Sequence, residues 1–288
     1  MRDFAFLEPT SVDDACRMLA TEGDEARLYA GGTALLLAMR QRLSIPSAVV
    51  YLGNVPGLDL IEFDETRGLR IGALARHADI AAHPAIRARY PFLAKMAEQV
   101  ANPQIRNMGT LGGNLCYGDP STDPPTCLLS LNATVTLRGP DGERVLKLED
   151  FYVDYFVTAL EQAEILIQVH VPPPAPDLVG AYIRFLKTPA EHRPLLGVGV
   201  TARYDQGFCR DVSIAIGASV RIPMRARTAE KFLEGNRVTA ETLAECGAIA
   251  AAEINPLSDF AGSADYRQQI AQVIVRRAAA RAFGIDMD

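Results

Sequence analysis

The N-terminal part of the chain alternates between helical and strand-like patterns of apolar residues. Residues 11–22 place apolar side chains at helical spacing behind a serine suited to capping, which predicts an amphipathic helix. Residues 26–30 predict a short strand, and residues 34–43 predict a second helix that ends in arginines. Apolar runs at 48–52 and 69–71 complete the pattern of a small α/β layer.

The middle of the chain combines helical patterns with a segment rich in glycine and proline. Residues 77–82 and 85–100 predict helices. Residues 102–125 hold four glycines and four prolines, which indicates a long ordered loop of the kind that is usually functional. Strands are predicted on both sides of a Gly-Pro-Asp-Gly turn and beyond it, at residues 133–137, 144–146 and 166–171.

A run of prolines divides the chain. Residues 172–176 read Pro-Pro-Pro-Ala-Pro, which favours a stiff extended linker, so we expect a domain boundary there. Beyond it the pattern predicts three antiparallel strands and then three helices, at residues 181–186, 195–204, 212–218, 226–233, 240–253 and 265–283. We therefore expect an α+β protein with subdomains at 1–55 and 56–176 and a C-terminal domain at 177–288.

Charge and hydropathy exclude several classes of function. The formal net charge of -6 and the pI near 5.4 argue against a nucleic-acid partner, because such binders usually display a basic face. The N-terminus lacks the pattern of a secretory signal, and no apolar run is long enough to span a bilayer. We therefore expect a cytoplasmic protein without a transmembrane segment.

The cysteines do not form a recognisable metal motif. Five are scattered along the chain with no Cys-x-x-Cys pair, so we interpret them as reduced thiols: Cys16, Cys116, Cys127, Cys209 and Cys246. Because Cys116 and Cys127 lie near each other in the glycine-rich segment, a redox or cluster role for these two is the alternative.

Two glycine-rich strings are the candidate ligand-binding sites. The first, Tyr29-Ala30-Gly31-Gly32-Thr33-Ala34, joins a predicted strand to a predicted helix, where backbone N–H groups suit a phosphate. The missing β-carbons let a ligand approach the backbone, and the Thr33 hydroxyl adds a donor. A plain tight turn is the alternative, since neither the Walker pattern nor Gly-x-Gly-x-x-Gly is present.

The second string covers residues 105–115 and reads Ile-Arg-Asn-Met-Gly-Thr-Leu-Gly-Gly-Asn-Leu. Two such loops suit a diphosphate better than one, so we expect the amides of residues 31–33 and 110–114 to converge on one pyrophosphate. Asp119 and Asp123 follow in a proline-stiffened stretch. Asp123 is a candidate acceptor for a ribityl or ribose hydroxyl, and a helix cap or turn is the alternative for each aspartate.

Together, the two strings resemble those of the FAD-binding subunits of molybdenum hydroxylases. That family includes the medium subunit of carbon monoxide dehydrogenase and the flavin domain of xanthine dehydrogenase, and the resemblance covers essentially the whole chain. It implies a vanillyl-alcohol-oxidase-like (PCMH-type) fold with FAD stretched between two α/β subdomains. The C-terminal domain, with a three-stranded antiparallel sheet and a helical bundle, would partly cover the cofactor.

The resemblance also implies which residues contact FAD. It assigns them to the two loops and to three later positions: Leu28, Tyr29, Ala30, Gly31, Gly32, Thr33, Ala34, Thr110, Leu111, Gly112, Gly113, Asn114, Asp123, Leu166 and Lys187. A cation such as Lys187 beside the ring would stabilise the anionic reduced flavin, and a surface lysine is the alternative. The chain departs from the family at Ala34 and at Arg193-Pro194-Leu195, and it has no cluster-binding insertion around Cys116.

The implied role is electron relay within a complex. A molybdenum-pterin cofactor would lie on a large partner subunit and two [2Fe-2S] clusters on a small one, with this FAD passing electrons to an external acceptor. The expected assembly is a dimer of heterotrimers. No Ser-His-Asp or metal spacing joins the four histidines, so no catalytic or metal-binding residue is predicted. We expect a structural capping role for His77 and regard His192 as the acceptor-side candidate.

Two other functions stay open on the sequence alone. A self-contained flavin oxidase or dehydrogenase would need a base and a substrate pocket, which the sequence does not identify. A non-catalytic assembly module without FAD is the second, and the intact glycine strings argue against it. The subunit role further predicts exposed apolar surface for partners.

Overall fold

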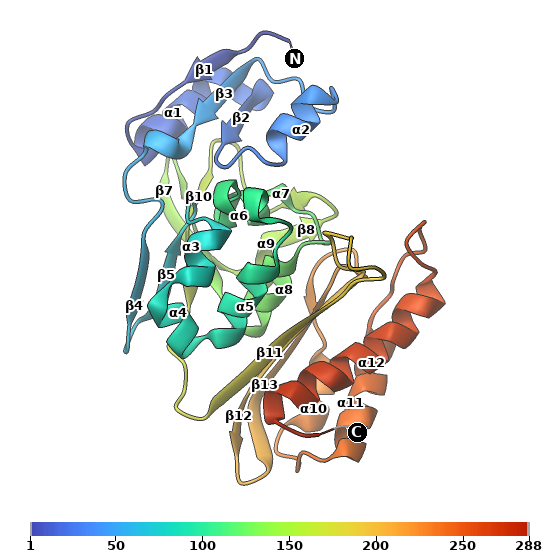
Figure 1. Cartoon of the computed structure of the whole chain (residues 1–288). Coiled ribbons are helices and arrows are strands. Elements are labelled where there is room, and N and C mark those ends of the chain that lie inside the picture. The colour runs from blue at the N-terminus through green and yellow to red at the C-terminus, as the bar shows by residue number, and fades with distance from the viewer. Residues whose placement is uncertain (1, 287–288) are drawn as a thin grey trace.

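The computed structural model describes residues 2–286, and three larger sheets follow one another along the chain (Figure 1). Each sheet supplies most of its buried apolar side chains to one of three clusters, although Tyr182 and Ala215 of the last sheet join the middle cluster and Ile165 of the middle sheet joins the first. The fold therefore has an N-terminal layer, a middle domain and a C-terminal domain. No described helix combines the length and the hydropathy that crossing a membrane requires.

The N-terminal layer is a parallel three-stranded sheet with helices packed beside it. Its strands run in the order β1 (Ala5–Leu7), β3 (Ala48–Tyr51), β2 (Ala26–Tyr29). The helical segments are α1 (Val12–Glu22), η1 (Gly23–Glu25), α2 (Leu35–Arg40) and η2 (Leu52–Asn54). Ser11 caps α1 as expected, because its Oγ accepts the N–H of Asp14. The helix expected up to residue 43 ends at Arg40, since Arg42 adopts a positive φ of 62°.

The strand at 69–71 does not belong to the N-terminal sheet, where the sequence placed it. It forms part of β5 in a five-stranded antiparallel sheet of the middle domain, and β1 takes the third place in the first sheet. The strands of the middle sheet, in order, are β4 (Ile61–Asp64), β5 (Gly68–Gly72), β10 (Ile165–Val171), β6 (Thr134–Gly139) and β7 (Gly142–Lys147). Strand pairing is non-local, so apolar character alone does not show which sheet a strand joins.

Short helices cover the middle sheet, and they correct two expectations. They are α3 (His77–Ala82), α4 (Pro84–Arg89), α5 (Pro91–Gln99), α6 (Pro103–Met108), α7 (Leu111–Tyr117), α8 (Asp123–Ser130) and α9 (Leu148–Phe151), followed by the hairpin β8 (Tyr152–Asp154) and β9 (Val157–Thr158). The single helix expected at 85–100 is interrupted because Pro91 opens a new helix. The loop expected at 102–125 is largely helical, with Asn102 and Thr110 as N-caps of α6 and α7.

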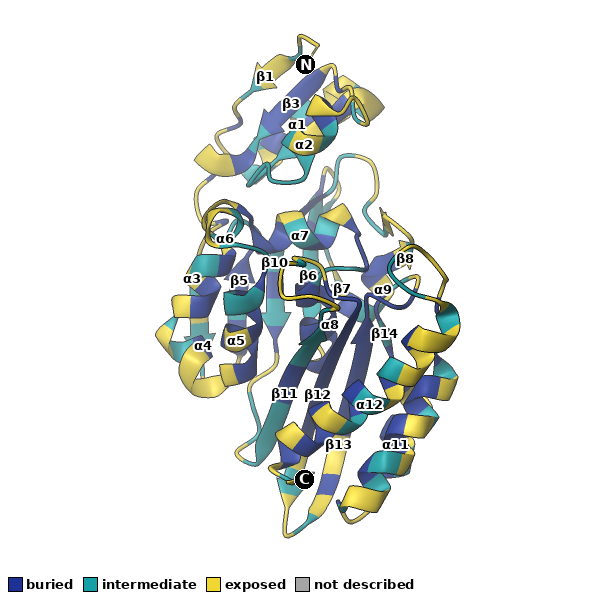
Figure 2. Cartoon of the chain, turned by 45° about the vertical axis from the view of Figure 1, so that its right-hand side comes forward, coloured by how far each residue is buried: buried dark blue, intermediate teal, exposed yellow. Residues whose placement is uncertain are grey.

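The C-terminal domain packs helices on one face of an antiparallel sheet. Its strands run in the order β11 (Leu178–Phe185), β12 (Leu196–Asp205), β13 (Phe208–Gly217), β14 (Met224–Arg225), so the sheet has four strands and not the expected three. The sequence missed β14 because it has only two residues. The helices α10 (Arg227–Leu233), α11 (Ala240–Glu253) and α12 (Ala264–Phe283) follow as expected. Figure 2 shows most of β12 and β13 buried and most of β11 of intermediate burial, with α12 packed across the sheet.

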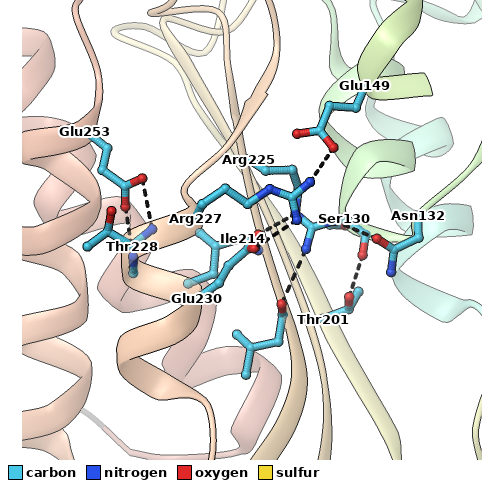
Figure 3. A network of polar contacts seen from close by, with 12 residues as sticks. Ser130, Asn132, Glu149, Thr201, Ile214, Arg225, Arg227, Thr228, Glu230 and Glu253 are labelled. Carbon is cyan, nitrogen blue, oxygen red and sulfur yellow. Dashed lines mark hydrogen bonds and ion pairs between the residues drawn. The ribbon is translucent and has the colours of Figure 1, made fainter. Parts of the chain in front are cut away.

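The middle and C-terminal domains share a buried polar interface (Figure 3). Arg225 pairs with Glu230 inside the C-terminal domain, and its Nη1 donates to Asn132 Oδ1 of the middle domain over 2.6 Å. Thr201 donates its hydroxyl to the carbonyl of Ser130 at 2.5 Å. Because both contacts cross from one domain to the other, they hold the two domains in a fixed relation.

Candidate cofactor-binding site

The two glycine loops lie against each other. A β-carbon on Gly31 would lie 2.0 Å from the carbonyl oxygen of Met108, so only glycine fits there. A β-carbon on Gly109 would lie 3.6 Å from Thr33 Oγ1, which is ordinary contact. The structure therefore brings together the two strings that lie more than seventy positions apart in the sequence.

The backbone N–H groups of the two loops are used differently. Among the described residues, no acceptor receives the N–H of Gly31, Gly32 or Thr33. In the second loop, the N–H groups are taken by acceptors within the chain: those of Leu111 and Gly112 by the carbonyls of Ala75 and Ala73 at 2.9 and 2.8 Å, and those of Gly113 and Asn114 by Thr110 at 3.2 and 3.0 Å. Of the expected donors in the second loop, only the N–H of Thr110 has no acceptor among the described residues, so most of these amides are already bonded and the convergence on a pyrophosphate stays a prediction.

Gly32 is required for two reasons. Its φ of +70° is strained for any residue with a side chain, and a β-carbon there would lie 2.4 Å from the ring of Tyr29. The Tyr29 ring in turn packs on Tyr51, with ring centroids 5.3 Å apart. Leu28 lies on β2 and packs against the N-terminal core, and Ala34 precedes α2, so both flank the loop.

Asn114 supplies an acceptor without a partner. Its Oδ1 is buried and accepts no hydrogen bond within residues 2–286. Leaving such an atom unpaired is unfavourable by about 1–3 kcal/mol, so a ligand donor at this point would stabilise the site. The free amides of Gly31–Thr33 and this oxygen fit a ligand that carries both phosphates and hydroxyl or ring N–H donors, as FAD does.

His77 lies behind the second loop and does not cap its helix. The N-cap of α3 is Arg76, and His77 packs beside Gly109, whose carbonyl accepts the His77 N–H at 3.2 Å. Its side chain is buried, and burial, helped by the charge of Arg106, lowers the pKa of His77 to about 4. The expected capping role is wrong, and the imidazole is neutral at physiological pH.

Asp123 is a buried carboxylate at the start of α8, a helix that contacts α7 of the second glycine loop. It is 3% exposed, Tyr182 donates to its Oδ1 at 2.8 Å, and Arg184 Nε lies 3.5 Å away. Burial raises the pKa of Asp123 to about 6, and the Arg184 cation and the Tyr182 hydrogen bond oppose that rise. Sequence reasoning missed both partners, because no local signal links β11 to α8.

Leu166 and Lys187 differ in their surroundings: Leu166 lies on β10, which contacts α7 of the second loop, and Lys187 lies in the segment after β11. Leu166 is buried in the core of the middle domain. The next carbonyl, of Ile167, accepts the N–H of Ala73, and the Ala73 carbonyl in turn holds the second loop. Lys187 is exposed and donates its Nζ to the carbonyl of Ala261 at 2.8 Å. The flavin contacts of these two residues stay predictions.

The model of a known family covers this architecture. Residues 2–174 match the model described as the FAD binding domain in molybdopterin dehydrogenase. The chain belongs to this family. Residues 181–282 of this family member match a second model, the C-terminal domain of carbon monoxide dehydrogenase flavoprotein. The two matches follow the division of the fold at the proline-rich linker.

Relatives of this family member align over almost their full length. The chain is 35% identical over 272 residues to the nicotine 6-hydroxylase medium subunit of Paenarthrobacter nicotinovorans, covering 94% of each chain. It is 33% identical over 279 residues to the carbon monoxide dehydrogenase medium chain of Afipia carboxidovorans, covering 97% of this chain and 96% of the relative. A solved carbon monoxide dehydrogenase from Hydrogenophaga pseudoflava superposes with a TM-score of 0.95 at 31% identity, covering 99% of both chains.

Proposed function

We propose that this chain is the FAD-carrying medium subunit of a molybdenum hydroxylase complex. It relays electrons from [2Fe-2S] clusters on a small partner subunit, through FAD, to an external acceptor, while a large partner carries the molybdenum-pterin cofactor. The observation that carries this proposal is the packing of the two glycine loops against each other within a chain that aligns end to end with medium subunits.

The residues of the chain hold and orient the cofactor. The N–H groups of Gly31–Thr33 donate to the diphosphate, and Asn114 Oδ1 accepts from a donor of the same ligand. Asp123 accepts from a ribityl or ribose hydroxyl, and the cation of Lys187 favours negative charge on the ring side. When bound, FAD supplies a carrier that exchanges electrons singly with clusters and in pairs with an acceptor.

A self-contained oxidase fits this site less well. Such an enzyme needs a base that takes a proton from an organic substrate beside the flavin. His77, which packs on the second glycine loop, is buried against that loop. Two hollows in the surface, of about 240 and 590 Å³, are lined by other residues than those of the glycine loops.

Exposed apolar side chains support the subunit role. Around the β8–β9 hairpin, Tyr155 is 49% exposed and Phe156 is 42% exposed, and their rings lie 4.7 Å apart. Phe156 adopts a positive φ of 57° in the two-residue turn of this hairpin, which holds the two rings at its tip. We infer that partner subunits cover apolar surface of this kind, in a cytoplasmic dimer of heterotrimers.

A glycine substitution tests the FAD assignment. The wild-type chain, expressed with its partners, is expected to bind one FAD per chain. In Gly31→Ala the new methyl group collides with the Met108 carbonyl and displaces the first loop, so FAD affinity should fall by a hundredfold or more, on the order of 3 kcal/mol. The measurement is FAD content by absorbance together with the dissociation constant from flavin fluorescence.

The matched control is Gly139→Ala in the hairpin of the middle sheet. Its β-carbon would meet only the Glu164 side chain, at 3.1 Å, so FAD content should stay at the wild-type level. Full FAD occupancy in Gly31→Ala would contradict the proposed site.

A further inference from the structure

The carboxylate of Asp123 is clamped by residues of the C-terminal domain. Tyr182 and Arg184 both lie on β11, two positions apart and therefore on one face of the strand. Tyr182 donates its hydroxyl to Asp123 Oδ1 at 2.8 Å, and Arg184 forms an ion pair with the same oxygen, with Nε 3.5 Å away and no hydrogen bond between them. Oδ2 has no side-chain donor among the described residues. The clamp thus acts at one carboxylate oxygen, and a backbone hydrogen bond of Asp123 itself also stabilises the carboxylate.

Arg184 connects three segments at one point. Its side chain is only 9% exposed. Besides facing Asp123, it donates to the carbonyl of Gln99 at the end of α5, and to the carbonyl of His192 at 2.7 Å. His192 lies in the segment after β11 that also carries Lys187. One buried guanidinium therefore ties the Asp123 side of the site to the segment assigned to the flavin ring.

Glycines on β12 make room for this arrangement. A β-carbon on Gly197 would lie 2.6 Å from the Tyr182 hydroxyl oxygen, and one on Gly199 would lie 2.7 Å from Ser130 Oγ on α8. Because α8 begins at Asp123, these two glycines let the helix and the tyrosine approach the sheet closely. The close contact between the domains thus sets the position of the carboxylate.

We propose that Arg184 and Tyr182 are positioning residues for FAD: they fix Asp123 so that Oδ2 faces the ribityl or ribose hydroxyls, and Arg184 fastens the Lys187 segment to the same point. This inference rests on the proposed function, in which Asp123 binds the cofactor. FAD retention then depends on the C-terminal domain, because the side chains of Tyr182 and Arg184 contact Asp123 and not the cofactor itself.

The clamp gives FAD binding a characteristic pH dependence. The titratable groups that face Asp123 are Arg184 and Tyr182 from β11 and Cys127 from α8. Burial raises the pKa of Asp123 to about 6, so below that pH the carboxylate is protonated and loses its strength as an acceptor. The dissociation constant for FAD should then rise, up to roughly tenfold for each pH unit below the midpoint. Without the Arg184 cation, the midpoint moves to higher pH.

Three full-length variants test the clamp by titration of FAD into apo-protein between pH 5.5 and 8. In Arg184→Gln we expect a dissociation constant about tenfold above wild type at pH 8, and a midpoint shifted upward. Arg184→Lys keeps the charge without the planar fork, so its midpoint should return toward that of wild type while its affinity stays reduced. The control Arg203→Gln removes an exposed arginine on β12 that pairs with Asp177, and it should bind as wild type does.

The outcomes separate this inference from the proposed function. If wild type binds no FAD, the proposed function fails, and the positioning role fails with it. If wild type binds FAD and a folded Arg184→Gln matches it at every pH, only the positioning role is overturned. Should Arg184→Gln not fold, as judged by thermal melting, Tyr182→Phe decides: a dissociation constant raised about threefold or more supports the clamp, and an unchanged one overturns it.

Discussion

At the scale of single residues, burial decides the charge state of groups whose roles the sequence left open. His77 is 3% exposed behind the second glycine loop, and its pKa is lowered to about 4. Asp123 is equally buried, yet its pKa is raised to about 6, because burial disfavours the charged form of either group. Burial therefore favours the neutral form of both groups. The His77 shift lowers stability as the pH falls, whereas the Asp123 shift lowers it as the pH rises.

His77 should make the folded chain sensitive to acid. Because its folded pKa lies below the unfolded value of about 6.5, its contribution to stability is present above pH 6.5 and is lost as the pH falls toward 4. We expect this residue to remove roughly 2 kcal/mol from the free energy of unfolding between pH 7 and pH 5. Urea denaturation of wild type and His77→Gln at both pH values measures the difference. An equal pH dependence in the two proteins would contradict the assignment.

At the scale of elements, small residues allow helix α8 to lie directly on the C-terminal sheet. The strand β12 carries Gly197 and Gly199 at alternate positions, and Gly217 lies on β13 beside them. A β-carbon on Gly217 would lie 2.0 Å from Thr126 Oγ1 of α8. These glycines, which interrupt the apolar pattern of the strands, therefore form the surface on which the helix that carries Asp123 packs.

Widening this contact should destabilise the chain. In Gly199→Ala the added methyl group lies 2.7 Å from Ser130 Oγ and 3.1 Å from the Thr126 carbonyl, so helix and sheet must move apart. We expect a loss of about 1–3 kcal/mol in the free energy of unfolding. Chemical denaturation followed by circular dichroism measures it, with Gly139→Ala as the glycine control. A loss no greater than that of the control would show that α8 does not rest on β12.

At the scale of the whole molecule, buried polar contacts join the middle and C-terminal domains into one unit. Arg225 and Glu230 have side chains that are 6% and 8% exposed, and Glu230 also accepts the N–H of Ile214 at 2.9 Å. The guanidinium reaches Asn132 in the middle domain (Figure 3). These contacts predict that the two domains unfold together.

The substitution Arg225→Met tests whether these buried polar contacts join the two domains into one unfolding unit. The substitution leaves the buried Glu230 with only the half-exposed Arg227 as a counter-ion and removes the donor to Asn132, so we expect a loss of about 3 kcal/mol in the free energy of unfolding. The control Arg203→Gln removes a half-exposed arginine on β12 that pairs with Asp177, and it should cost below about 1 kcal/mol. Fluorescence and circular dichroism should report one shared transition in wild type. Two separated transitions in wild type would contradict a single cooperative unit.

The sequence by itself determined most helices and the longer strands and marked the two glycine strings, because these depend on local backbone preferences and on spacing along the chain. It misplaced the strand at 69–71, took residues 102–125 for a loop, and missed the short strands β1, β4, β8, β9 and β14. Strand partners are chosen across distance, and capped helices of two turns leave little periodicity.

Only the tertiary structure decided which polar atoms of the candidate site are free. The N–H groups of residues 111–114 are used within the chain, those of Gly31–Thr33 are not, and Asp123 is held by Tyr182 and Arg184 from another domain. A residue's type states what it can donate or accept. Its partners are set by packing between segments that lie far apart in the sequence. For this reason the sequence can predict the residues of a site but not the hydrogen bonds that they make.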